Sequence, residues 1–253
     1  MTEPYETTVG ECIRARAAAF PDRIAIDMVG EGRETYAECF AASLQLARGL
    51  MAAGVRQNDT VVVMAPNCLT SIHAWLGVNL AGATEVTINT AYRARLLEHA
   101  VNISGARVVI AAAEFLPVLR DSEDALPKIQ QIIVFDPLGS PASPERPSFN
   151  RIRLLSLDEV LAHLSDADLP TVRMSDIASV IYTSGTTGPA KGIMMPHAQV
   201  CGLAKQSIDG LRLGEDDAFY CFHPLFHMAG KFMAVFAMLM AGGRIILDRT
   251  FKA

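Results

Sequence analysis

Short runs of β-branched and aliphatic residues alternate along this chain with segments of helical spacing. The runs expected to form strands are 24–29, 60–64, 84–88, 107–111, 131–135, 177–183, 218–222 and 244–247. Apolar strands that alternate with helices are typical of parallel sheets covered by helices. The sequence therefore predicts an α/β fold with mostly parallel sheets flanked by helices.

Two capping boxes mark predicted helix starts. Thr35 is followed three positions later by Glu38, and Ser156 by Glu159, so that each side chain can bond the backbone N–H of the other residue. Gly54 is expected to end the first helix, because glycine readily adopts the left-handed conformation that closes one. Between 136 and 149, four prolines without periodicity predict an exposed connection.

The apolar stretch 232–241 is about half as long as the ~20 residues that a membrane-spanning helix requires. It predicts a buried helix, with Met228, Phe232, Met233, Phe236 and Met240 at the spacing of a core face. The acidic N-terminal region contains no apolar run of the length found in a signal peptide, so secretion is not expected.

Charge and cysteine usage narrow the function classes. The formal net charge is -5 and no basic cluster is present, which argues against a nucleic-acid partner. The five cysteines are dispersed and include no Cys-x-x-Cys pair, so we expect neither a disulfide framework nor a metal site built from them. A cytoplasmic location fits this pattern.

The most informative segment is residues 182–192, Tyr-Thr-Ser-Gly-Thr-Thr-Gly-Pro-Ala-Lys-Gly, directly after a predicted strand. Glycines let backbone N–H groups point into one concavity, hydroxyls donate hydrogen bonds, and a lysine neutralises charge, which together suit a polyphosphate. The alternative is a turn with no ligand, since such residues favour loops for conformational reasons alone. A P-loop of the Walker type is excluded, because Ala190 precedes Lys191 and Gly192 follows it.

This segment resembles the phosphate-loop signature of the AMP-forming adenylating superfamily, which includes acyl-CoA synthetases, aryl-CoA ligases, luciferases and peptide-synthetase adenylation domains. The usual form is Tyr-Thr-Ser-Gly-Thr-Thr-Gly-x-Pro-Lys-Gly, and this chain departs from it with Pro189-Ala190. The resemblance implies that the β- and γ-phosphates of ATP, with Mg²⁺, are held by Thr183, Ser184, Gly185, Thr186, Thr187, Gly188 and Lys191. It further implies that a carboxylate attacks the α-phosphorus, and that the thiol of CoA then displaces AMP.

A second cluster, residues 221–230, reads Cys-Phe-His-Pro-Leu-Phe-His-Met-Ala-Gly. In CoA ligases and luciferases a Pro-x-x-His segment at this distance brings a histidine beside the substrate carboxylate and α-phosphate, and His227 falls on that position. Taken alone, such a histidine is more often a core or turn residue. A metal pair of His223 and His227 is disfavoured, because Pro224 argues against the helix that would align them. We expect substrate contacts from His227, Met228, Ala229 and Gly230, with His227 and Lys191 catalytic.

Three further expectations follow from the resemblance. His197 is expected to be a structural residue at a helix start. The segment 226–229 lacks the aspartate that amino-acid-selecting domains place there, so an uncharged organic acid tail is expected. Residues 89–93 and 102–107 look most like the carnitine or crotonobetaine CoA ligase branch, which is a family-level analogy.

The superfamily's glutamate for magnesium, its ribose-binding aspartate and its C-terminal domain are not found before residue 253. The resemblance thus implies that 1–253 is a truncated N-terminal AMP-binding domain, inactive as a fragment. The alternative is a non-catalytic nucleotide-binding or interaction module. We also expect apolar faces at 232–240 and 245–247 to be left uncovered, which favours a homodimer or other self-association.

Overall fold

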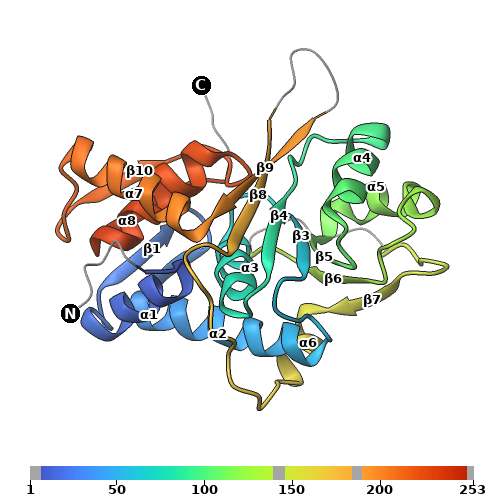
Figure 1. Cartoon of the computed structure of the whole chain (residues 1–253), viewed down its shortest axis with the longest axis horizontal. Helices are drawn as coiled ribbons and strands as arrows, with labels where there is room; N and C mark the ends of the chain where they lie inside the picture. The colour runs from blue at the N-terminus through green and yellow to red at the C-terminus, as the bar shows by residue number, and fades with distance from the viewer. Residues whose placement is uncertain (1–6, 139–145, 184–189, 250–253) are drawn as a thin grey trace.

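The computed structural model describes residues 7–138, 146–183 and 190–249 (Figure 1). Its strands are β1 (Ile24–Met28), β2 (Gly32–Thr35), β3 (Thr60–Met64), β4 (Thr84–Thr87), β5 (Val108–Ala112), β6 (Gln131–Phe135), β7 (Arg153–Ser156), β8 (Ile177–Thr183), β9 (Lys191–Pro196), β10 (Ala218–Cys221) and β11 (Arg244–Leu247). Its α-helices are α1 (Val9–Ala19), α2 (Tyr36–Ala52), α3 (Leu69–Leu80), α4 (Ala94–Ser104), α5 (Leu116–Asp121), α6 (Leu157–Ala162), α7 (His197–Leu211) and α8 (Ala237–Ala241). Short 3₁₀ turns, η1 (Ala113–Phe115) and η2 (Glu123–Ala125), flank α5, and a π-helix, η3 (Ala229–Phe236), precedes α8.

The strands form two sheets. One has seven strands in the order β7-β6-β5-β3-β4-β8-β9, and the other has four in the order β10-β11-β1-β2. Neighbouring strands are parallel except in the pairs β8–β9 and β1–β2. The predicted α/β fold with mostly parallel sheets flanked by helices is confirmed.

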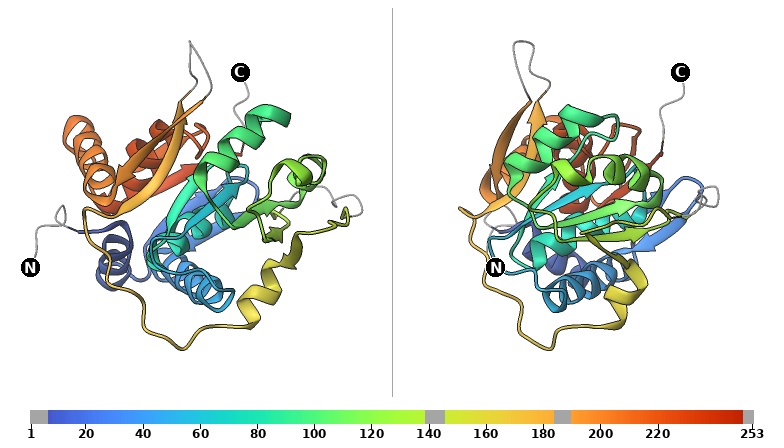
Figure 2. Two further views of the ribbon diagram at one scale, coloured as in Figure 1. Left: turned by 45° about the vertical axis from the view of Figure 1, so that its right-hand side comes forward. Right: turned by 90° about the vertical axis from the view of Figure 1, so that its right-hand side faces the viewer.

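Helices α2 and α3 join the two halves of the molecule. Leu50 of α2 and Val78 of α3 pack in the core of the seven-stranded sheet, whereas Tyr36 of α2 and Trp75 of α3 pack in the core of the four-stranded sheet. Figures 1 and 2 show β8 and β9 between α4 on one side and α7 on the other. The hairpin that carries the predicted phosphate loop therefore stands where the two halves meet.

Both predicted capping boxes are present. The Thr35 hydroxyl accepts from the backbone N–H of Glu38 at 3.2 Å, and the Glu38 carboxylate accepts from that of Thr35 at 2.8 Å. Ser156 and Glu159 do the same at the start of α6. Gly54 has φ +94° just after α2, as expected of a residue that ends a helix.

Several elements differ from expectation. Strands β2, β7 and β9 and helix α1 were not predicted. The predicted helix over 231–240 begins as the π-helix η3, whose wider turn cannot be distinguished from α-helical spacing in so short a segment. In the connection 136–149, the described residues contain no helix or strand, and residues 139–145 lie outside the described part.

The expectation of uncovered apolar faces is wrong for the described residues. Phe232, Phe236, Ile245 and Leu247 are all fully buried, because α1, α3 and α7 cover them within this chain. In the same segments only Met233, with 39% exposure, is a large exposed apolar side chain. Among the described helices, none combines the length and the hydropathy needed to cross a membrane.

Candidate functional site

The loop hairpin places two of the predicted phosphate-binding residues opposite each other. Thr183, the last residue of β8, pairs with Lys191, the first residue of β9, and Tyr182 pairs with Gly192. Both Thr183 and Lys191 are exposed. The other predicted loop residues, Ser184, Gly185, Thr186, Thr187 and Gly188, lie outside the described residues. The two stems are thus defined, and they bring a hydroxyl and an ammonium group to the base of the loop.

Gly192 has a packing role that its place in a phosphate loop did not predict. A Cβ atom at Gly192 would lie 2.9 Å from Cγ1 of Val180 and 3.3 Å from Cε1 of Tyr182. A side chain there would collide with Val180 and crowd the Tyr182 ring across the hairpin, so glycine allows both side chains to lie against the opposite strand.

Tyr182 is buried, and its hydroxyl donates to the carbonyl of Ala100 in α4 at 2.5 Å. Burial raises the pKa of Tyr182 to about 12, with the nearby Tyr92 adding to the shift. The phenol therefore remains a protonated donor at neutral pH. This contact fixes the incoming stem of the hairpin on α4.

His227 and Tyr182 line one pocket of ≈60 Å³, although they are far apart in sequence. The residues around the pocket are Thr87, Asn89, Tyr92, Tyr182, Phe226 and His227. Thr87 ends β4 and pairs with Ile181 of the parallel strand β8. Because ligands of open α/β sheets bind outside the carboxyl ends of the strands, this pocket has the expected location for a substrate site.

His227 lies in a turn rather than in the core. Its side chain is exposed, and its backbone N–H donates to the carbonyl of Pro224 at 3.0 Å. Of the alternative that His227 is a core or turn residue, the core assignment is therefore wrong, whereas the turn assignment agrees with its position. An exposed imidazole at the pocket can donate a hydrogen bond or carry positive charge toward an anion.

Asn67 holds the His227 turn and was missed by the sequence analysis. Its amide group donates to the carbonyls of His223 and Asp248 at 3.0 and 2.9 Å, and its oxygen accepts from the backbone N–H of Leu225 at 2.9 Å. The side chain thus ties the end of β3 to the ends of β10 and β11. Its position after a predicted strand was the only available signal.

The helix that follows the turn is anchored by a buried charge. Lys231 pairs with Glu85 of β4, whose other carboxylate oxygen accepts from Ser179 of β8 at 3.0 Å. The ammonium group lies 5.4 Å from the centroid of the Trp75 ring. Burial lowers the pKa of Lys231, and Glu85 opposes that shift.

The three predicted substrate contacts after His227 differ in their surroundings. Met228, with 41% exposure, and Ala229 are open to solvent. Gly230 is buried, and a Cβ there would lie 2.7 Å from the Pro224 carbonyl oxygen and 2.8 Å from that of His223. It serves close backbone packing of the turn. Met233, predicted as core, is exposed on the same helix, so that prediction is wrong.

His197 is structural, as expected. It is the first residue of α7, is buried, and accepts from the backbone N–H of Val9 through Nδ1 at 3.2 Å. Burial lowers the pKa of His197 to about 4, against smaller opposing effects of Asp176 and Glu11.

Glu34, Cys39 and His73 could together offer three metal ligands, but His73 Nε2 lies 2.7 Å from Glu34 Oε2. Because ligands that share a zinc ion stand about 3.3 Å apart at bond lengths of ~2.0 Å, this contact is a hydrogen bond rather than a prepared ion site.

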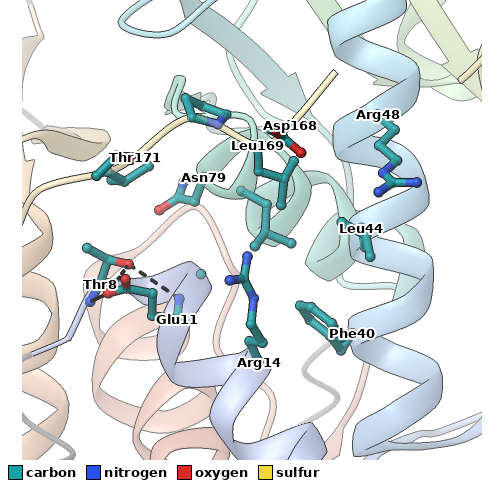
Figure 3. A pocket seen from close by; sticks show the side chains of 14 residues that line it. Thr8, Glu11, Arg14, Phe40, Leu44, Arg48, Asn79, Asp168, Leu169 and Thr171 are labelled. Atoms are coloured by element: carbon teal, nitrogen blue, oxygen red, sulfur yellow. Dashed lines mark hydrogen bonds between the residues drawn. The ribbon is translucent and has the colours of Figure 1, made fainter. Parts of the chain in front are cut away.

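A larger pocket of ≈510 Å³ lies between α1, α2, α3 and residues 168–172 (Figure 3). Arg14 and Arg48 line it, together with Asn79 near the end of α3. Asn79 precedes β4, whereas Thr87 is the last residue of that strand, so the two pockets lie at opposite ends of the strands. None of the predicted site residues that the structure describes lines this larger pocket.

The fold and the site define a class of α/β protein in which the stem of a β-hairpin and a histidine turn line one pocket at the carboxyl ends of parallel strands. The chain belongs to the AMP-binding enzyme family, whose model matches residues 13–253.

Curated relatives of the chain include CoA ligases. The 4-coumarate-CoA ligase 1 of Narcissus pseudonarcissus is 30% identical over 224 residues, which are 86% of this chain and 38% of that protein. The 3-[(3aS,4S,7aS)-7a-methyl-1,5-dioxo-octahydro-1H-inden-4-yl]propanoyl:CoA ligase of Rhodococcus jostii (strain RHA1) is 29% identical over 253 residues, 97% of this chain and 48% of that protein. The chain thus spans less than half the length of these relatives.

Solved structures agree on the fold. The anthranilate CoA ligase AuaEII, in complex with anthranoyl-AMP, superposes with a TM-score of 0.85 at 23% identity, over 98% of this chain and 46% of that one. The long-chain-fatty-acid-CoA ligase FadD1 of Archaeoglobus fulgidus gives a TM-score of 0.83 at 23% identity, over 98% and 48%.

Proposed function

We propose that this chain supplies the phosphate loop and the carboxylate-facing histidine of an ATP-dependent, AMP-forming acyl-CoA ligase. The observation that carries the proposal is the pocket shared by His227 and Tyr182. Tyr182 immediately precedes Thr183, which faces Lys191 across the hairpin. A polyphosphate on the loop and a carboxylate in the pocket would therefore be neighbours.

The proposed reaction has two steps. A carboxylate oxygen attacks the α-phosphorus of ATP, the bond from that phosphorus to the β-phosphate oxygen breaks, and pyrophosphate leaves. The thiol of CoA, losing its proton, then attacks the acyl carbon, and AMP leaves. Lys191 and Thr183 would neutralise and orient the departing pyrophosphate, and His227 would donate to the substrate oxygens as the two anions approach.

Magnesium would reach the site with ATP and would screen its phosphate charge. The described residues that line the pocket include no carboxylate, so we assign none of them to the ion. ATP and CoA are both substrates in this proposal.

The substrate proposed is an organic acid without an amino group. Phe226 and Tyr92 line the pocket beside His227 with aromatic surface. The described lining residues include no acidic side chain that could pair with the ammonium group of an amino acid. Residues 102–107 carry no substrate information, because Asn102 bonds the Ala125 carbonyl and Arg107 pairs with Asp59 away from the pocket. The resemblance to carnitine or crotonobetaine ligases stays a prediction.

The test is ATP/pyrophosphate exchange with 4-coumarate, benzoate, hexanoate and crotonobetaine, and with phenylalanine as an amino-acid control. It is run on this chain and on a version extended at its carboxyl end. Exchange that requires one of the acids, and that falls about 100-fold or more in Lys191→Ala or His227→Ala, supports the proposal.

A non-catalytic nucleotide-binding or interaction module is the second candidate, because the exposed Thr183 and Lys191 of the hairpin stems would serve ligand binding without any reaction. MgATP binding by both versions, with no exchange for any acid, would replace the ligase proposal with this one. Location in the cytoplasm remains a prediction.

Self-association also stays a proposal, on a different surface from the one expected. Ile193 and Met194 of the edge strand β9 have exposures of 44% and 66%. Sedimentation of the wild-type chain and of Met194→Lys measures the oligomeric state. We expect a wild-type dimer that dissociates in the variant, and a wild-type monomer would contradict the proposal.

A further inference from the structure

Helix α4 contacts both stems of the loop hairpin through two consecutive residues. Ala100 receives the Tyr182 hydroxyl at 2.5 Å, as described above. The preceding residue, His99, lies with Nε2 3.0 Å from the carbonyl oxygen of Ala190, which immediately precedes Lys191. The first contact holds the stem that enters the loop, and the second holds the stem that leaves it.

Helix α4 is suited to serve as a fixed support. Leu97, Ala100 and Val101 are buried in the core of the seven-stranded sheet, and Gly105 ends the helix in the left-handed conformation. Figure 2 shows α4 alongside the hairpin. Because the helix is held by this core, which also includes Tyr182 and Ala190 of the two stems, it can define where the stems lie.

The acceptor fixes the direction of the His99 hydrogen bond. A carbonyl oxygen only accepts, so Nε2 must carry the proton, in the neutral ring or in the imidazolium. Ala190 has only 7% of its surface exposed. The loss of this donor would therefore weaken the support of a buried carbonyl group and free the start of β9 to shift.

We propose that His99 is a positioning residue for the loop: its Nε2–H, bonded to the Ala190 carbonyl, keeps Lys191 opposite Thr183 at the base of the hairpin loop. The inference rests on the proposed function, because positioning is useful only if the loop binds phosphates. His99 touches no substrate in this scheme, and it acts through the backbone that carries Lys191.

The test compares His99→Leu, which removes the donor, with His99→Gln, whose amide group can replace it. His163→Leu is the matched control, because His163 is an exposed histidine that bonds its own helix through the Glu159 carbonyl. Calorimetric titration with MgATP, magnesium pyrophosphate and AMP is combined with amide hydrogen exchange over 190–196.

We expect His99→Leu to raise the dissociation constants for MgATP and pyrophosphate about threefold to tenfold, the effect of one net hydrogen bond. AMP, which lacks the β- and γ-phosphates, should bind within twofold of wild type. Amide exchange at 191–193 should accelerate in His99→Leu, and His99→Gln and His163→Leu should resemble wild type.

Unchanged MgATP binding and exchange in His99→Leu would overturn the positioning role and leave the proposed function standing. An equal loss of MgATP and AMP binding, or a His99→Gln as weak as His99→Leu, would also overturn it. If wild type binds neither MgATP nor pyrophosphate, the proposed function fails, and the positioning role fails with it.

Discussion

Lys231 and Glu85 form an ion pair that is almost entirely withdrawn from solvent, with side-chain exposures of 2% and 1%. Lys231 also donates its backbone N–H to the carbonyl of His227 at 3.0 Å. The pair therefore connects the His227 turn to β4, the strand whose last residue, Thr87, lines the same pocket.

Lys231→Met is expected to lower the free energy of unfolding by about 3–5 kcal/mol, because it leaves the Glu85 charge buried without its partner. The double variant Lys231→Met with Glu85→Leu removes both charges and should recover most of that loss. Urea unfolding followed by circular dichroism measures both.

Lys205→Met is the control for that prediction, since Lys205 and Asp209 form a solvent-exposed pair four residues apart. Its effect should be about 0.5 kcal/mol or less. A Lys231→Met variant that is no less stable than this control would show that the buried pair does not support the fold.

The second prediction concerns pH. Burial lowers the pKa of His197 to about 4, whereas the unfolded chain has the ordinary value near 6.5. Between those values the unfolded state binds the extra proton, so stability should fall as pH falls from about 6.5 to 4, by as much as roughly 3 kcal/mol.

The measurement is the urea midpoint at several pH values for wild type and His197→Asn. The variant has no imidazole to protonate, so its stability should depend less on pH across this window. The pKa values of Glu38 and Glu159 are also lowered, so these groups change the stability only below about pH 4.5. They do so equally in wild type and in His197→Asn. Parallel pH curves would contradict the prediction.

The sequence predicted most of the parallel strands because buried strands are continuous apolar runs, as in Val61–Met64 and Ile132–Phe135. It missed β2, β7 and β9, in which Met195 is the only buried residue. Thr183, Lys191 and His227 were found through the resemblance of local motifs.

The supporting residues of the site could not be found in that way. Asn67 bonds a carbonyl 156 residues away, and His99 bonds one 91 residues away. Such contacts depend on how whole elements pack against each other, and neither residue belongs to a recognisable local motif.

The third prediction contrasts two glycines. Gly230→Ala brings Cβ within 2.7 and 2.8 Å of two backbone carbonyl oxygens in the His227 turn. Since backbone cannot move aside as a side-chain tip can, we expect a loss of about 1–3 kcal/mol. Gly202→Ala in α7 meets no atom within 4 Å and should stabilise by about 0.5–1 kcal/mol. Thermal unfolding of both variants checks the difference, and similar values would contradict the close approach at Gly230.

The last prediction uses Asn67 to test how the two sheets are joined at the site. Asn67→Ala removes three hydrogen bonds to the ends of β10 and β11, and at about 0.5–1.5 kcal/mol each it should cost roughly 2–3 kcal/mol. Asn67→Asp is nearly isosteric, but it replaces the donating NH₂ group with a carboxylate oxygen that faces two carbonyl oxygens.

Asn67→Asp should therefore be less stable than Asn67→Ala at pH 7, although it keeps the acceptor for Leu225. Protonation restores one donor, so the difference should narrow as pH is lowered toward 4.5. Asn102→Asp, which loses a single bond to the Ala125 carbonyl, is the control and should cost about 1 kcal/mol. Urea midpoints at both pH values measure these effects. If Asn67→Asp were as stable as Asn67→Ala at pH 7, the result would contradict the assignment of the amide NH₂ group as the donor that joins the two sheets. A carboxylate oxygen is repelled there only if the group it replaces lies between two carbonyl oxygens.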